Sequence, residues 1–275
     1  MINKKQSLIL ILSLGLWANG FAATDATATQ VAWSYSGQSG PQNWGQLNPD
    51  FNLCGTGKTQ SPINITGTWP NTPDFLNINY VSAPLIIMEN GPTTLELGHT
   101  KTIVNTGHGT QVNFSSSGEQ IDLDGTPYQL VQFHIHTPSE NQLQGKRFPA
   151  EIHFVHQGPQ GQVAVIGVFV KIGKPNATLQ EIIDHIPQKV GIPVTVAGVK
   201  INPAQLIPMR QNYYQFKGSL TTPPCTEGLE WLVMINPISA SQAQINALTA
   251  AAGGPNARPI QPLNGRKIMA SVEKA

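Results

Sequence analysis

Short runs of β-branched and other apolar residues recur along this chain, and glycine, proline or asparagine interrupts most of the gaps between them. The clearest runs are Leu85–Met88, Thr102–Val104, Gln111–Phe114, Gln129–His136, Glu151–His156, Val163–Ile172 and Trp231–Ile235. Runs of this length are typical of strands, and the interruptions are typical of turns, so the pattern predicts a multistranded sheet with hairpin connections. The 26 glycines and 22 prolines follow no collagen-like period and agree with a fold rich in turns.

Helices are expected to be a minor part of the fold. One is predicted over Ala177–Ile186 and a second over Ser239–Ala252, which opens with Ser239 and Gln242 at the spacing of a capping box and ends before a glycine. No internal repeat or proline-rich linker divides the chain, so we expect a single mainly β (α+β) domain.

The N-terminal segment has the three parts of a secretory signal peptide. Lys4 and Lys5 precede the apolar run Ser7–Ala18, and small residues follow it up to Ala23. This run is too short to cross a bilayer, and no stop-transfer pattern follows it, so a retained membrane anchor is the weaker alternative. We therefore expect a signal peptide at residues 1–22 and an exported domain at residues 23–275. The expected location is the periplasm, with secretion as the alternative.

Cysteine usage and charge restrict the chemistry further. Cys54 and Cys225 are the only cysteines, and an isolated pair in an exported chain is typical of one disulfide, although two buried free thiols remain possible from the sequence alone. Charged residues make up 11% of the chain, and the formal net charge is +1. No basic face for nucleic acid is therefore expected.

The histidines carry the strongest functional signal. The segment Gln132–His136 alternates polar and apolar residues, so that His134 and His136 project from one face of a strand while Phe133 and Ile135 project from the other. Two neighbouring imidazoles on one face can share a metal ion. This spacing is also common on strands that bind no metal, so further residues are needed to decide.

A second predicted strand supplies those residues. Glu151 and His153 share a face of it, and His153 completes a set of three nitrogens if the two strands are close. Three neutral imidazoles with an open fourth position are the arrangement of a catalytic zinc. Gln132 and Glu151 each precede a predicted ligand by two positions on the same face, where each can accept the second N–H of an imidazole. These acceptors favour a metal site over isolated structural histidines.

Other common catalytic signatures are absent from the sequence. It has no His-Glu-x-x-His motif, no Cys-x-x-Cys pair, no glycine-rich phosphate loop and no Gly-x-Ser-x-Gly elbow. The sequence therefore disfavours metalloproteases of that type, zinc fingers, phosphoryl transfer and serine hydrolysis.

Several segments together resemble the α-class carbonic anhydrases, from Trp33 to about Ile268. The segments that carry the resemblance are Gln60–Ile65, Asn105–His108, Gln132–His136, Ala150–His156, Ser219–Cys225 and Asn256–Pro259. The resemblance implies a central twisted, mostly antiparallel sheet of about ten strands with short peripheral helices. It implies a zinc enzyme that hydrates carbon dioxide reversibly to bicarbonate and a proton, by attack of zinc-bound hydroxide, with ester hydrolysis as a secondary activity.

The resemblance also implies roles for particular residues. The Zn²⁺ ligands would be His134, His136 and His153, with hydrogen-bond acceptors from Gln132, Glu151 and the backbone carbonyl of Asn256. Thr221 would be a gatekeeper hydroxyl that donates to Glu140, with Thr222 beside it. The apolar wall for carbon dioxide would consist of Val155, Val165, Leu220 and Trp231. His108 would be the proton shuttle, and exported members of the family also have a disulfide matching Cys54 and Cys225.

Two alternatives belong to other functional classes. A zinc-free binding module would be expected to lack one of the ligand histidines, and all three are present here. A zinc hydrolase acting mainly on esters would use the same residue types, so the sequence does not separate it from a carbonic anhydrase. The expected partner is a small molecule, without nucleic acid or a membrane anchor in the mature chain, and the expected assembly is a monomer or homodimer.

Overall fold

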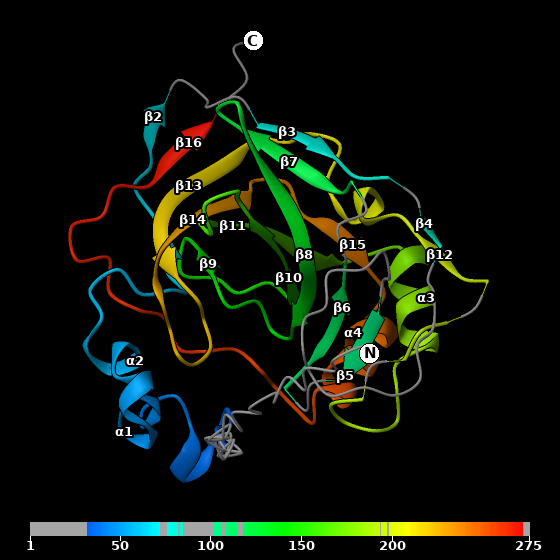
Figure 1. The fold of residues 1–275 in the computed structure, drawn as a ribbon, viewed down its shortest axis with the longest axis horizontal. Coiled ribbons are helices and arrows are strands. Elements are labelled where there is room, and N and C mark those ends of the chain that lie inside the picture. The colour runs from blue at the N-terminus through cyan, green and yellow to red at the C-terminus, as the bar shows by residue number, and fades with distance from the viewer. Residues whose placement is uncertain are drawn as a thin grey trace, which may run out of the picture. The chain divides into compact units, whose positions relative to one another are not determined.

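The chain folds mainly into strands joined by a few short helices (Figure 1). The computed structural model describes residues 32–71, 76–81, 83–84, 102–105, 108–114, 118–192, 194–196 and 198–271. The strands are β1 (Asn64–Ile65), β2 (Trp69–Asn71), β3 (Leu76–Asn79), β4 (Ala83–Pro84), β5 (Thr102–Asn105), β6 (Thr110–Asn113), β7 (Gln120–Leu123), β8 (Thr126–His136), β9 (Gln142–Leu143), β10 (Ala150–Gln157), β11 (Val163–Ile172), β12 (Lys200–Ile201), β13 (Tyr213–Ser219), β14 (Glu227–Met234), β15 (Ile238–Ala240) and β16 (Met269–Ser271). The helices are η1 (Gly37–Ser39), α1 (Trp44–Leu47), η2 (Pro49–Phe51), α2 (Leu53–Thr56), α3 (Ala177–Asp184), η3 (Pro203–Leu206) and α4 (Gln242–Ala251).

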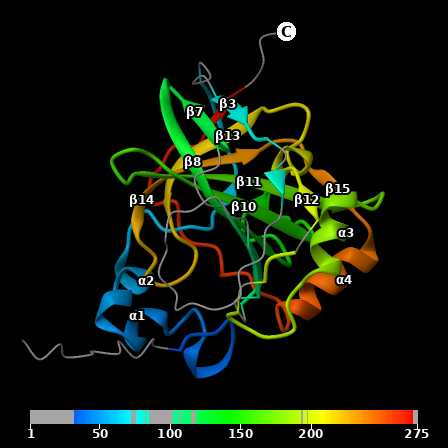
Figure 2. The same cartoon turned by 45° about the vertical axis from the view of Figure 1, so that its right-hand side comes forward.

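Twelve of the strands form one mixed sheet. Its main path runs β2-β16-β13-β14-β11-β10-β8-β6-β5, and β3, β7 and β15 pair off this path. Most neighbours are antiparallel, whereas β11 with β14, β11 with β15 and β16 with β2 are parallel. The sheet curls strongly, and the helices lie at its periphery, with α1 and α2 on one side and α3 and α4 on another (Figures 1 and 2). The predicted fold class, a curled and largely antiparallel sheet with short peripheral helices, is confirmed.

The long central strands β8, β10 and β11 separate two environments. On one face, Phe133 and Ile135 of β8 and Phe154 of β10 enter the larger apolar core. On the opposite face a second apolar cluster includes Val165 of β11 and Trp231 of β14. The alternation over the last five residues of β8, 132–136, therefore buries Phe133 and Ile135 in the core and leaves His134 and His136 on the other face.

The two longer helices start where side-chain caps are available. Helix α3 begins after Asn176, whose side chain accepts the Leu179 N–H at 3.0 Å. Helix α4 begins after Ser241, which forms a capping box with Gln244. The predicted cap at Ser239 was wrong, because that residue pairs with β11 as part of β15. The sequence repeats the capping pattern two residues later, and strand pairing selects the second copy.

The disulfide between Cys54 and Cys225 is present, with the two Cα atoms 5.0 Å apart. This confirms the predicted pairing. It connects α2 to the loop between β13 and β14, and the described residues belong to one compact unit. No helix in the described ranges is long and apolar enough to cross a membrane. The predicted signal peptide at residues 1–22 and the apolar run Leu85–Met88 lie outside the described residues.

Candidate metal centre

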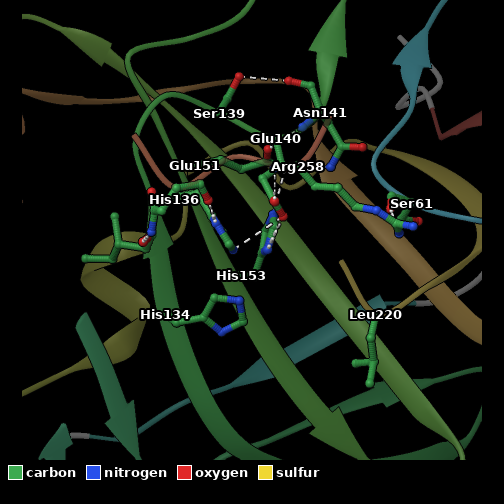
Figure 3. Close-up of polar contacts among 12 residues, drawn as sticks. Ser61, His134, His136, Ser139, Glu140, Asn141, Glu151, His153, Leu220 and Arg258 are labelled. Atoms are coloured by element: carbon green, nitrogen blue, oxygen red, sulfur yellow. Dashed lines mark hydrogen bonds and ion pairs between the residues drawn. The ribbon is translucent and has the colours of Figure 1, made fainter. Parts of the chain in front are cut away.

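Strand pairing brings the three predicted ligand histidines together. Strands β8 and β10 are antiparallel neighbours in which His153 lies directly opposite His134, and Glu151 lies opposite His136. One ring nitrogen from each histidine lies within 4.8 Å of the other two. The three imidazoles gather above the sheet in Figure 3. Their spacing and donor type suit a tetrahedral metal with one position left for a further ligand.

Each of these histidines has its other ring nitrogen next to an acceptor. His134 donates from Nδ1 to Oε1 of Gln132 at 2.8 Å, and His136 donates from Nδ1 to the backbone oxygen of Asn256 at 2.7 Å. His153 Nε2 lies 3.2 Å from Oε1 of Glu151. These acceptors fix which nitrogen carries hydrogen, so Nε2 of His134, Nε2 of His136 and Nδ1 of His153 are left to bind a metal.

Burial keeps two of the imidazoles neutral, as metal binding requires. Burial and then the neighbouring His136 and His153 hold the pKa of His134 well below its usual value. Burial likewise lowers the pKa of His136, although Glu140 partly opposes this. His136 Nε2 is also buried without a hydrogen-bond partner among the described residues. A buried lone pair of this kind fits a metal ion.

Glu151 is held as a carboxylate by its neighbours. Burial alone would raise the pKa of this group, but His153 and Asn141 together lower it. Asn141 donates to both oxygens, from its backbone N–H to Oε2 and from Nδ2 to Oε1, each at 2.8 Å. Asn141 therefore fixes the orientation of Glu151, and through it that of His153 (Figure 3). No sequence pattern points to Asn141, because its contact with Glu151 depends on how the connection between β8 and β10 folds back.

Glu140 is fully buried beside the three imidazoles. Its Oε1 accepts the backbone N–H of Arg258 at 2.8 Å, and its Oε2 lies 3.4 Å from Nε2 of His136. Oε2 has no hydrogen-bond partner among the described residues, so it does not pair with Thr221 here. Thr221 itself is buried in the loop after β13, as is Cys225 four residues later.

The four predicted wall residues gather in one apolar cluster. Val165 and Trp231 are 2% exposed in this cluster, and Val155 and Leu220 pack against them. The Trp231 ring contacts the His153 ring edge to face, with centroids 4.8 Å apart. The cluster therefore adjoins the metal centre. Thr222, the other predicted substrate contact, accepts the Cys225 N–H at 2.8 Å through its backbone oxygen.

His108 lies just before β6 and is not a member of the three-histidine group. Its ring stacks on that of Trp33 with centroids 3.8 Å apart, and its Nε2 lies 2.9 Å from the Trp33 backbone oxygen. Because a carbonyl oxygen can only accept, Nε2 carries the hydrogen in this contact. Trp33 was noted only as the start of the family resemblance. Its contact with His108 spans 75 residues and has no local sequence signal.

A buried arginine joins the centre to the disulfide region. Arg258 donates from its guanidinium to Oε1 of Gln60 at 2.9 Å and to the backbone oxygens of Ser61 at 2.7 Å and Cys54 at 3.0 Å. Burial lowers its pKa to about 10, which still leaves it charged at neutral pH. Arg258 lies in the segment Asn256–Pro259 that carries the family resemblance, but no role for it is predicted from the sequence.

Comparisons with known proteins agree with this geometry. The family described as eukaryotic-type carbonic anhydrase matches residues 39–272. Carbonic anhydrase from Neisseria gonorrhoeae is 40% identical over 248 residues, covering 89% of this chain and 90% of that protein. Carbonic anhydrase from Pectobacterium atrosepticum is 40% identical over 269 residues, covering 96% and 98% respectively. The structure of α-carbonic anhydrase from Thermovibrio ammonificans, solved with the inhibitor sulfanilamide, superposes with a TM-score of 0.77 at 36% identity and covers 87% of this chain and 99% of that one.

Proposed function

This chain belongs to the eukaryotic-type, or α-class, carbonic anhydrase family, a family of lyases, and we propose that it hydrates carbon dioxide reversibly to bicarbonate and a proton. The observation that carries the proposal is the convergence of three imidazoles, of which two hold acceptors with their outer nitrogens and the third has its outer nitrogen 3.2 Å from the Glu151 carboxylate. We propose that His134, His136 and His153 hold Zn²⁺. When bound, zinc supplies a Lewis acid that lowers the pKa of a water ligand to about 7.

Thr221 and Glu140 are proposed to select and orient the ligand that reacts. The Arg258 N–H occupies Oε1 of Glu140, so Oε2 is the oxygen that can accept the Thr221 hydroxyl. When the threonine hydroxyl donates its hydrogen to a carboxylate, its oxygen can act only as an acceptor toward any other ligand. That ligand must therefore have a proton to donate. This arrangement would favour protonated oxygen ligands and orient their lone pair toward the substrate. Thr222 is proposed to contact the substrate beside it.

The apolar cluster next to His153 is proposed to receive carbon dioxide. The substrate has no net charge or dipole, so a wall of aliphatic and indole carbon suits it. Val155, Val165, Leu220 and Trp231 supply such a wall beside the three imidazoles. The reaction then needs no charged substrate anchor, in agreement with the low charge content of the chain.

His108 is proposed to carry the product proton to solvent. Its Nε2–H donates to the Trp33 carbonyl oxygen, so Nδ1 is the nitrogen that would take up a proton. Stacking on Trp33 holds the ring while it changes charge. Chemistry and proton export are then separate steps that depend on different residues.

The test of function is stopped-flow carbon dioxide hydration on the exported form of the chain, before and after zinc removal with dipicolinate and after zinc is added back. We expect fast hydration that depends on zinc and that sulfanilamide inhibits. Zinc bound at one per chain without hydration would contradict the proposal. Hydrolysis of an activated ester measured on the same preparation would then identify the ester hydrolase alternative.

The variant His108→Ala tests the proposed shuttle. In a dilute buffer that accepts protons poorly, we expect turnover to fall by about 10-fold or more, because general acid–base groups contribute at least that much. Concentrated imidazole should restore it, since dissolved imidazole can accept the proton directly. Equal losses in both buffers would contradict the assignment.

Export is proposed from separate observations. The disulfide between Cys54 and Cys225 is consistent with an oxidising, extracellular compartment. Together with the predicted signal peptide at residues 1–22, it supports a periplasmic location, with secretion as the alternative. Mass spectrometry of the mature N-terminus from fractionated cells would test the cleavage and the location together.

A further inference from the structure

Asn256 makes hydrogen bonds to two parts of the proposed active site. Its side chain is 1% exposed and lies in the irregular segment between α4 and β16. Its Nδ2 donates to the backbone oxygens of His108 at 2.8 Å and Ile135 at 3.1 Å, and its Oδ1 accepts the Thr137 N–H at 2.7 Å. Both N–H groups of this amide and its carbonyl oxygen therefore have backbone partners.

The partners of this amide lie on two segments that are far apart in the sequence. Ile135 and Thr137 flank the ligand His136 at the end of β8, whereas His108 belongs to the turn that leads into β6. The backbone oxygen of Asn256 accepts from the His136 ring at 2.7 Å. The main chain of Asn256 therefore orients the metal ligand, and its side chain ties the His108 peptide to the same strand end.

The glycine after His108 makes this contact possible. A Cβ on Gly109 would lie 2.8 Å from Nδ2 of Asn256 and 3.2 Å from the Ile135 oxygen. The backbone of Gly109 also has φ near 149°, which L side chains rarely adopt. The hydrogen bonds of Asn256 and the lack of space for a side chain at Gly109 therefore both indicate that the two segments approach closely.

We propose that the Asn256 side chain is a positioning residue for proton transfer, which fixes the His108 backbone relative to the metal centre. This proposal rests on the proposed function, because it assigns Asn256 to the shuttle step of that reaction. The ring of His108 is held by Trp33, and its backbone by Asn256. Positioning errors of about 1 Å can cost about 100-fold in rate, so a loosened His108 would slow the proton step.

The first variant is Asn256→Ala, which removes both Nδ2 donors but keeps the backbone oxygen that holds His136. In the zinc-loaded chain we expect kcat in dilute buffer to fall by about 10-fold or more, while kcat/KM changes by less than about 3-fold. Concentrated imidazole should restore kcat. The zinc dissociation constant, measured by chelator competition, should change by less than about 10-fold, which is the lower end for loss of an outer partner of a metal ligand.

Gly109→Ala disturbs the same contact from the opposite side and serves if Asn256→Ala does not fold. It should show the same buffer-dependent loss of kcat. The matched control is Asn176→Ala, which removes the side-chain cap of α3 and loosens the start of that helix. This control should show wild-type kcat in every buffer. Hydrogen exchange of the metal-free chain should accelerate around His108 in the first two variants and not in the control.

The possible outcomes distinguish failure of the proposed role of Asn256 from failure of the proposed function. If the wild type hydrates carbon dioxide and imidazole rescues His108→Ala, the shuttle stands. Unchanged kcat in Asn256→Ala, or a parallel loss of kcat and kcat/KM that imidazole does not rescue, then overturns the role of Asn256 alone. If the wild type is inactive with zinc bound, or His108→Ala shows no rescue, the proposed function or its shuttle fails first, and the role of Asn256 falls with it.

Discussion

Strand β10 carries two buried histidines in different environments. His153 lies on the face of the sheet that holds the three imidazoles, and His156 lies on the face that packs into the apolar core. His153 uses one nitrogen toward Glu151 and turns the other toward two further imidazoles. His156 donates from Nδ1 to the Ala164 oxygen at 3.2 Å, so its Nε2 accepts the Tyr80 hydroxyl at 2.6 Å. Both residues are buried and both contact acceptors. The difference lies in the second nitrogen, which is satisfied by a hydroxyl in one case and left for a metal in the other.

This comparison shows what separates a structural histidine from a ligand. Burial lowers the pKa of His156 to about 3, and it also lowers the pKa of the proposed ligand His136. A depressed pKa therefore does not identify a metal site by itself. The convergence of several unpaired nitrogens does, and it requires neighbouring strands in the correct register.

The largest expected effects are on zinc content and on stability, when one histidine is replaced on each face of the sheet. We expect His136→Ala to lose stoichiometric zinc and, with it, carbon dioxide hydration, because two imidazoles do not hold the ion. We expect His156→Ala to keep one zinc per chain and to lose about 2 to 5 kcal/mol of stability, through the cavity and the unpaired Tyr80 hydroxyl. Metal analysis after dialysis and urea unfolding measure the two effects. Zinc retention by His136→Ala, or zinc loss by a folded His156→Ala, would contradict the proposed difference between a ligand and a structural histidine.

A smaller effect is expected from the hydroxyl that satisfies the core histidine. Tyr80→Phe leaves Nε2 of His156 buried without a partner and should cost about 1 to 3 kcal/mol in the free energy of unfolding. Zinc content should stay at one per chain. Tyr214→Phe is the matched control, since its ring is only partly buried, and it should cost less than about 0.5 kcal/mol. Equal costs for the two variants would show that the Tyr80 bond contributes nothing specific.

The smallest effect is a change in how stability depends on pH. The pKa of His156 is about 3 in the folded chain and about 6.5 when unfolded, so between these values the unfolded chain binds more protons. The free energy of unfolding of the metal-free chain should therefore fall as pH drops below about 6.5, with His134 and His136 acting in the same direction. His156→Phe should reduce that slope by up to about 1.4 kcal/mol per pH unit. Urea unfolding at several pH values between 7 and 5 measures it, and identical slopes would contradict the assignment.

Much of the fold and of the metal face could be predicted because it depends on local alternation. The period of two in β8 determines that Phe133 and Ile135 are buried and that His134 and His136 share the other face. The same period in β10 places Glu151 beside His153. What alternation does not determine is register, and the direct pairing of His153 with His134 depends on how the connection between the strands closes.

The contacts that could not be predicted from the sequence join residues that are far apart in the chain, and no sequence motif contains both partners. Tyr80 meets His156 across 76 residues, and the Arg258 guanidinium meets Ser61 across 197. Neither partner carries a spacing that predicts the other. No sequence pattern indicates what His156 contacts, and the structure shows that it is hydrogen-bonded to Ala164 and Tyr80.

The hydrogen bond from His136 to the Asn256 carbonyl spans 120 residues. If the chain is exported N-terminus first, as proposed, all three proposed ligand imidazoles emerge once residue 153 has passed, well before Asn256 follows. A metal ion captured at that stage would meet His136 before the carbonyl oxygen that orients its ring has arrived. Under the proposed export, translocation would therefore first expose a loosely ordered set of ligands, and the centre would be complete only when the final part of the polypeptide arrives.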